Sequence, residues 1–226
     1  MDVPAKSNGG RSMTYFINTW RTPKNGNLFS VTDASETSLR NTDHPGNITV
    51  TLAPSDPINR SLMVVGTVGG FDTLGEIEDF HDAILKDGSR YSALDRISSL
   101  CDHTNHSISE ILKFKDWPTN FTPKYVKRDL ITPQSGALPE LLDLLSEWRE
   151  ESTSKVHWVF SQTVQALSMA EGLRVSHFAE SLEELLQFHS QDIRENSRMK
   201  RFGELIKNPP TRATSRITYF KQGASS

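Results

Sequence analysis

One segment of the chain reads Thr14-Tyr-Phe-Ile-Asn-Thr-Trp-Arg-Thr-Pro-Lys-Asn-Gly-Asn-Leu28, and 110 residues later the chain reads Lys124-Tyr-Val-Lys-Arg-Asp-Leu-Ile-Thr-Pro-Gln-Ser-Gly-Ala-Leu138. The two segments share identical residues at five matched positions: Tyr15/Tyr125, Thr22/Thr132, Pro23/Pro133, Gly26/Gly136 and Leu28/Leu138. Each segment predicts a strand, then a Pro/Gly turn, then the start of a helix.

Three more pairs of segments match in the same order, with offsets of 107 to 109 residues. They are 68–71 with 175–178, 74–81 with 182–189, and 107–109 with 216–218. Changes of one to three residues in the offset require only short loop insertions. The sequence therefore predicts that one structural unit has been duplicated within the chain.

Each copy is predicted to run β-α-β-β-α-β, the order of a ferredoxin-like unit. The first copy has expected strands at 13–21, 47–53, 62–71 and 106–112, and expected helices at 28–41 and 73–86, the second of which continues through 91–100. The second copy has expected strands at 125–132, 156–162, 172–178 and 216–220, and expected helices at 138–151 and 181–206. Thr73 and Ser181 are natural N-caps, and Thr73 with Glu76 has the spacing of a capping box.

The predicted domain organisation follows from this reading. A disordered arm at 1–12 precedes one ferredoxin-like repeat at 13–112, and a linker at 113–123 leads to the second repeat at 124–222. One such unit leaves a sheet face uncovered. Two four-stranded antiparallel sheets are therefore expected to face each other, with the helices outside.

Composition excludes several classes of function. Lys and Arg number 25 against 28 Asp and Glu, for a net charge of −3, which does not predict nucleic-acid binding. The single cysteine, Cys101, excludes an internal disulfide and a Cys-rich metal site, and favours a cytoplasmic location. No apolar run approaches the ~20 residues of a membrane span.

The repeated segments resemble the dimeric α+β barrel superfamily, and within it the antibiotic-biosynthesis-monooxygenase-like domains. The resemblance rests on 22–26 with its repeat at 132–136, and on 70–74 with its repeat around 178–182. It implies an α+β fold in which two ferredoxin-like βαββαβ repeats form an intramolecular dimeric α+β barrel. The chain would then be a monomer with an internal pseudo-dimer, or a homodimer of it.

The resemblance also implies three kinds of function. The leading one is a small-molecule tailoring enzyme, a cofactor-independent monooxygenase-like oxidoreductase acting on an aromatic or polyketide-type metabolite. The alternatives are a heme-binding or heme-degrading protein, and a non-catalytic ligand-binding barrel. Phe71 and Phe178 stand where many monooxygenase members carry Trp, and Tyr91 and Met199 stand nearest the position of the histidine that heme-degrading members use.

The first strand of each copy has one polar residue on an apolar face. Offset 110 places Asn18 and Arg128 at the same position. The resemblance implies a functional Asn near Asn18, and Arg128 could stabilise developing negative charge on a substrate. The alternative is that each side chain satisfies a local hydrogen bond or ion pair, as buried polar groups must.

Histidines supply the remaining candidates. His81 and His189 recur on the apolar face of the second predicted helix, where they could transfer a proton or simply be retained from the duplicated ancestor. In the second copy, His177 alternates with apolar residues, and Trp158 lies on the opposite face of its strand from His157.

An aromatic wall beside an imidazole suits a flat phenolic ligand, although core packing is the more common role for a residue such as Trp158. The second copy is therefore expected to hold the working pocket. The predicted catalytic residues are His177, His189 and Arg128, and the predicted substrate-binding residues are Trp158, His157, Asn18, His81 and Phe178. No metal site is predicted, because His103 and His106 are expected to lie in a solvated turn.

Overall fold

The structure is a computed structural model that describes residues 14–54, 62–118, 120–151, 155–166, 172–192 and 196–223. The first half contains β1 (Tyr15–Pro23), α1 (Leu28–Arg40), β2 (Gly46–Pro54), β3 (Val64–Phe71), α2 (Leu74–Lys86), α3 (Gly88–Ser99) and β4 (Cys101–Phe114). The second half contains β5 (Tyr125–Ile131), α4 (Leu138–Glu150), β6 (His157–Ala166), β7 (Leu173–Ala179), α5 (Leu182–Asp192), α6 (Asn196–Leu205) and β8 (Thr211–Lys221). Both halves run β-α-β-β-α-α-β.

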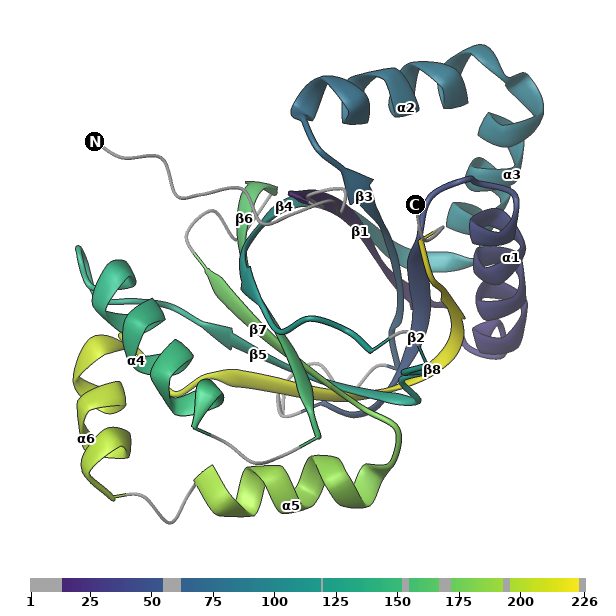
Figure 1. The fold of residues 1–226 in the computed structure, drawn as a ribbon. Coiled ribbons are helices and arrows are strands. Elements are labelled where there is room, and N and C mark those ends of the chain that lie inside the picture. Colours follow the sequence, from purple (N-terminus) through teal and green to yellow (C-terminus); the bar gives the residue numbers. More distant parts are fainter. Residues whose placement is uncertain are drawn as a thin grey trace.

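The strands form one closed antiparallel barrel in the order β1-β3-β2-β8-β5-β7-β6-β4, and the helices surround it (Figure 1). β1 lies between β4 and β3, and β5 lies between β8 and β7, so the strands of Tyr15 and Tyr125 occupy equivalent positions as expected. The two halves meet at two seams, β2 with β8 and β4 with β6.

The structure has the α+β barrel that the resemblance implied, and the two expected four-stranded sheets are joined within it. The edge strands of the two halves hydrogen-bond to each other, and the sheet closes into a ring. Closure pairs backbone groups that an open sheet would leave exposed at its edges.

The two quoted segments fold in the same way. Gly26 and Gly136 each take a left-handed conformation, with φ of 83° and 75°, which glycine adopts without strain. Just before each glycine, the backbone N–H of Lys24 donates to the carbonyl of Leu100 at 2.9 Å, and that of Gln134 donates to the carbonyl of Leu205 at 2.8 Å. Each turn is thereby tied to the end of the last helix of its own half.

The predicted N-caps are confirmed. Thr73 Oγ1 accepts a hydrogen bond from the N–H of Glu76 at 3.2 Å, and Ser181 Oγ accepts one from the N–H of Glu184 at 3.1 Å. These bonds satisfy backbone donors that the first turn of a helix leaves unpaired.

The match of 68–71 with 175–178 at offset 107 is wrong. Asn18 pairs with Thr67 and Arg128 pairs with Ser176, so the third strands of the two halves correspond at offset 109. The register of β1 shifts between Tyr15 and Ile17, and Gly70 turns left-handed with φ of 82°. This irregularity turns Phe71 outward against helix α2, whereas Phe178 points into the barrel end.

Three element boundaries also differ from prediction. β4 begins at Cys101, so the segment from 102 to 106 is strand and not a solvated turn. β8 begins at Thr211 and not at 216, and the long helix expected at 181–206 is two helices. The missed strand residues are mostly polar, and they are strand because they pair with the neighbouring strand of the barrel: Thr104 lies opposite Arg21 and Thr211 opposite Leu130.

The barrel has an outer face, covered by the helices, and an inner face. Successive residues of a strand alternate between the two. On the outer face of the second half, Leu141, Leu145, Phe160, Leu173 and Phe202 belong to one buried apolar cluster that joins the strands to α4 and α6. Within the described residues, no helix is long and apolar enough to cross a lipid bilayer.

Candidate functional site

Charged side chains lie beneath the helices of the second half. On β5, Lys127 and Asp129 point to the outer face together with Ile131, and His177 on β7 is the register partner of Lys127. All three polar side chains are buried, with residue exposures of 7%, 7% and 0%. Burial of charged groups is costly unless they are paired, so their mutual geometry matters.

These groups line a small cavity of about 40 Å³, which is room for a few water molecules. Its floor is the barrel strands, and its walls include Trp148 and Arg149 from α4 and Met199 and Phe202 from α6. Arg212 on β8 completes the polar side.

Asp129 is the centre of the polar group. Its Oδ2 lies 3.2 Å from Lys127 Nζ and 3.8 Å from His177 Nδ1, and its Oδ1 accepts a hydrogen bond from Arg212 Nε at 3.0 Å. One carboxylate therefore faces two cations and an imidazole. A carboxylate beside one ring nitrogen orients an imidazole and favours a proton on it, which is how general bases are commonly held.

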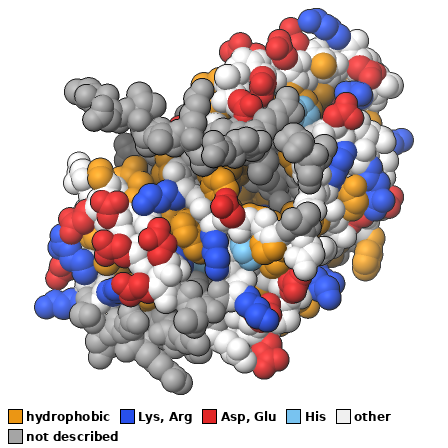
Figure 2. All heavy atoms as spheres, in the orientation of Figure 1, with side chains coloured by type: hydrophobic (Ala, Val, Ile, Leu, Met, Phe, Trp, Pro, Cys, Tyr) orange, Lys and Arg blue, Asp and Glu red, His pale blue; other side chains and the backbone are white. Residues whose placement is uncertain are grey.

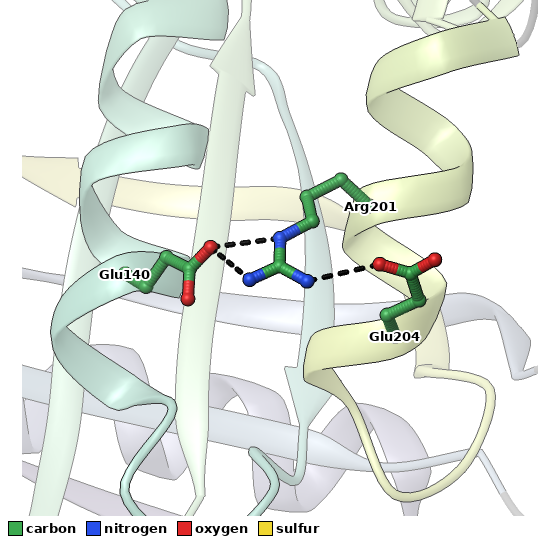
Figure 3. A network of polar contacts seen from close by, with 3 residues as sticks. All are labelled: Glu140, Arg201 and Glu204. Carbon is green, nitrogen blue, oxygen red and sulfur yellow. Dashed lines mark hydrogen bonds and ion pairs between the residues drawn. The ribbon is translucent and has the colours of Figure 1, made fainter.

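The helices over this cavity are joined at the surface by an ion-pair network (Figure 3). Arg201 of α6 donates from Nε to Glu140 of α4 at 2.7 Å and from Nη1 to Glu204 at 2.9 Å, and its Nη2 also contacts Glu140. Arg198 Nη2 donates to Glu151 Oε1 at 2.7 Å. These contacts hold α6 against α4 at the outer wall of the cavity.

Trp158 lies beside His177 on the outer face, as its register partner across β6 and β7. The indole stacks on Phe160, with ring centroids 4.5 Å apart, inside the apolar cluster under α4. Its Nε1 is buried and has no hydrogen-bond partner among the described residues. The predicted pairing of an aromatic wall with an imidazole is thus present on this face.

His157 and Phe178 lie on the other face, at one end of the barrel. The segment between β4 and β5 crosses the ring of strands here (Figure 1), and its Trp117 and Phe121 pack on these two side chains. Phe220 stacks on Trp117 with centroids 5.6 Å apart. Burial lowers the pKa of His157, and the charge of Lys115 lowers it further. This group of rings closes one end of the barrel, and we call it the aromatic plug.

Asn18 and Arg128 point into the barrel. Asn18 Oδ1 accepts a hydrogen bond from Thr67 at 2.9 Å, and Arg128 Nη1 donates to Thr49 Oγ1 at 3.2 Å. Because Lys127 pairs with His177 while Arg128 pairs with Ser176, Arg128 and His177 lie on opposite faces of the sheet. The structure does not bring these two predicted catalytic residues to one substrate position.

The repeated helix histidines lie apart from the cavity. His81 on α2 is exposed. Its neighbour Phe80 packs on the apolar cluster of Phe71, and His81 does not belong to that cluster. His81 nonetheless adds to the lowering of the pKa of His106, which burial and Arg21 lower more strongly. His189 lies on α5, and its side chain is outside the described residues.

Sequence reasoning missed Lys127, Asp129 and Arg212 on the outer face, and Arg174 and Trp20 on the inner face. A signal was present in the run Lys127-Arg-Asp129, because three consecutive charges in an otherwise apolar strand must bury at least one of them. Alternation along β5 then separates them between the two faces.

No protein-family model and no curated protein matches the chain. Solved structures do match it. An anthrone oxidase-like protein has a TM-score of 0.65 at 9% identity, covering 94% of each chain. A proposed monooxygenase from Fusobacterium nucleatum subsp. nucleatum has a TM-score of 0.69 at 10% identity, covering 93% of this chain and 95% of that one. A proposed chlorite dismutase has a TM-score of 0.56 at 8% identity, covering 92% and 96%. At these identities the likeness establishes a common fold.

Proposed function

From the dimeric α+β barrel fold that the chain shares with those proteins, we propose that it is a cofactor-independent, monooxygenase-like enzyme acting on a small phenolic molecule. The reaction would take place in the outer-face cavity of the second half. The observation that carries the proposal is the group of Asp129, His177, Lys127 and Arg212, which lines a small cavity together with the ring of Trp148.

The residues have the chemistry that such a reaction needs. His177, held beside Asp129, would take a proton from the substrate and leave an electron-rich phenolate or enolate. Lys127 and Arg212 would stabilise that negative charge, which develops only as the proton leaves. The substrate then supplies the electrons: a CH₂ group and O₂ become a carbonyl group and water. The protein contributes a base, cations and exclusion of bulk water.

The size of the cavity limits what can bind. Pockets that hold drug-sized ligands measure roughly 300–1,000 Å³, and this cavity measures about 40 Å³. Heme does not fit it. A phenolic substrate would enter only if α6 moved away from α4, which would separate Met199 and Phe202 from the strands.

Oxygen uptake tests the proposal. The full-length protein is incubated with phenols and anthrone-type substrates, and O₂ consumption and carbonyl product are measured together. We expect His177→Gln to lower kcat by about 10²- to 10⁴-fold, because it removes the base. His103→Gln in the first half is the matched control, since His103 is exposed and far from the cavity, and its turnover should equal that of the unaltered protein.

The same preparation distinguishes the heme alternative. A Soret band that appears on titration with hemin and saturates at one equivalent would favour heme binding over the cofactor-independent reaction. Unchanged turnover in His177→Gln would remove the proposed base.

We also propose that the chain is a tandem pair of ferredoxin-like units acting as a monomer. The common element order, the paired turns at Gly26 and Gly136 and the paired N-caps support the tandem origin. Closure of the barrel within one chain supports the monomer, since each strand already has two neighbours.

A further inference from the structure

The inner face of the barrel carries two buried cations. Arg128 on β5 and Arg174 on β7 are 5% and 4% exposed. Their direction follows from register: Arg128 pairs with Ser176, and Leu130, two residues after Arg128, pairs with Arg174. Both guanidinium groups therefore belong to the inner face, opposite to His177 and Asp129.

No carboxylate on the described strands faces these cations. The eight strands contain three acidic residues, Asp102, Glu110 and Asp129. Asp129 is on the outer face, Glu110 pairs with Tyr15, which packs with the outer cluster of Ile17 and Phe71, and Asp102 is exposed at the start of β4. A buried cation without a counter-ion is costly to the folded state.

The two arginine side chains reach across the interior. Arg174 lies over the ring of Trp20, with its guanidinium carbon 5.0 Å from the centroid, although β7 and β1 are not neighbours in the barrel. Arg128 reaches Thr49 on β2, which is not a neighbour of β5 either. Stacking occupies the face of the Arg174 guanidinium and leaves its N–H edge available, and its Nε has no acceptor among the described residues.

Further hydrogen-bond donors are unpaired around the same interior. Asn18 Nδ2 and the hydroxyls of Ser107 and Ser109 have no partner among the described residues, and these three residues are at most 7% exposed. Ser107 pairs with Asn18 across β4 and β1, so they lie side by side on the inner face. Buried donors without acceptors, beside two cations, are the complement of an anion with several oxygen atoms.

We propose that the barrel interior binds an oxyanion, a carboxylate or a phosphate, between Arg128 and Arg174, at a site separate from the outer-face cavity. A planar carboxylate would take parallel hydrogen bonds from the edge of the stacked Arg174 guanidinium. Arg128 would supply the second charge, and Asn18 and the serine hydroxyls further donors. Burial lowers the pKa of Arg128 to about 9 and that of Arg174 to about 10, so both carry their charge at neutral pH.

Thermal unfolding of the full-length protein tests the proposal. Benzoate and inorganic phosphate are titrated at constant ionic strength, with chloride as the balancing anion and benzyl alcohol as the uncharged match for benzoate. We expect the Tm to rise with benzoate or phosphate, by roughly 5–10 °C at 100 times Kd, and to stay constant with benzyl alcohol. Which of the two anions is effective identifies the ligand class.

Arg128→Met and Arg174→Met remove each charge with little change of volume. Each should abolish the anion-dependent rise in Tm, and each should unfold at a higher Tm than the unaltered protein in anion-free buffer, because an uncompensated buried charge is gone. Arg40→Met, which removes an exposed arginine, should keep the full response. Calorimetric titration of the unaltered protein gives the same answer without relying on the folding of any variant.

Two results would overturn the proposal: a Tm that responds no more to benzoate and phosphate than to chloride, or a response that survives in the Arg128→Met/Arg174→Met double variant. The outcome is independent of the proposed reaction. His177→Gln should keep the anion response, because its side chain is on the other face of the sheet.

Discussion

At the residue scale, Asp129 is the side chain on which the outer-face cavity depends. It is the carboxylate within 3.2 Å of Lys127 and hydrogen-bonded to Arg212, and it is 7% exposed. Asp129→Asn would remove the negative charge that Lys127 and Arg212 share. Breaking a buried pair in this way typically costs about 3–5 kcal/mol, so we expect a loss of that order in the free energy of unfolding by urea.

The control for this change is Asp82→Asn on α2. Asp82 is paired with Lys86 at 3.1 Å, but both side chains are more than half exposed. Such pairs contribute about 0–1 kcal/mol. Equal losses of unfolding free energy in the two variants would show that burial does not strengthen the ion pairs of Asp129.

Because His157 is buried in the aromatic plug, we expect the stability of the folded protein to depend on pH. Burial lowers its pKa in the folded state below the ordinary value of about 6.5, so on acidification the unfolded chain takes up this proton first. Stability should therefore fall as the pH drops below about 6.5, by at most about 1.4 kcal/mol per pH unit for this one group. Urea unfolding at pH 5, 6, 7 and 8 measures the slope.

His157→Phe should flatten that slope, because a phenyl ring can pack on Trp117 and Phe121 without titrating. Phe220→Leu should leave the slope unchanged, because it alters the aromatic plug without removing a titratable group. A steeper slope in His157→Phe would contradict the assignment.

The sequence predicted correctly on which face of a strand a side chain lies where alternation along that single strand determines the face. Alternation correctly grouped His177 with Leu173 and Val175, and separated Trp158 from His157. It could not show that Arg128 and His177 belong to opposite faces, because that depends on the register between β5 and β7. Register is a tertiary property set by turns and by packing of the whole sheet.

At the scale of elements, α6 is held to α4 mainly through the Glu140, Arg201 and Glu204 network at the surface and through Phe202 beneath it. Arg201→Ala should change the global stability very little, because the network is exposed. It should nonetheless increase local opening, which hydrogen exchange detects as faster exchange of the α6 amides.

Lys86→Ala is the matched variant. It also removes an exposed ion pair, but one confined within α2. Its α6 amides should exchange at the rate of the unaltered protein. If Arg201→Ala leaves α6 exchange unchanged as well, the network does not hold the outer wall of the cavity.

Elements with local signals were predicted well, and elements that depend on distant partners were not. The Pro/Gly turns and the caps at Thr73 and Ser181 are fixed by residues close in sequence, and they were correct. The starts of β4 and β8 are polar segments that become strand only because β1, β5 and β2 lie beside them. Nothing within such a segment indicates its partner.

At the scale of the whole molecule, neither half can satisfy its own sheet. Half one alone exposes the edges of β2 and β4, and half two alone exposes those of β6 and β8. We expect chains cut between Pro118 and Thr119 to aggregate when expressed separately and to co-purify as a one-to-one complex when expressed together. Size-exclusion chromatography with circular dichroism checks both outcomes. A first half that is folded and monomeric by itself would contradict the interdependence of the halves.

On the face that Figure 2 shows, acidic and basic side chains mix, in keeping with the small net charge. The concentration of unpaired positive charge on the inner face is therefore a local property. Composition could not reveal it, because a count of 25 basic residues does not show where two arginines lie in the fold.

The place of β8 has a consequence for synthesis of the chain. β8 is synthesised after every other strand of the barrel, and it lies between β2 and β5, whose own residues were made long before. Until β8 emerges, both of those strands have an open edge, and the ring is missing one member at the junction of the two halves. The nascent chain carries the open edge of β2 while residues 55–210 are made and that of β5 while residues 132–210 are made. These exposed edges make it a natural client for chaperones that shield unpaired strands.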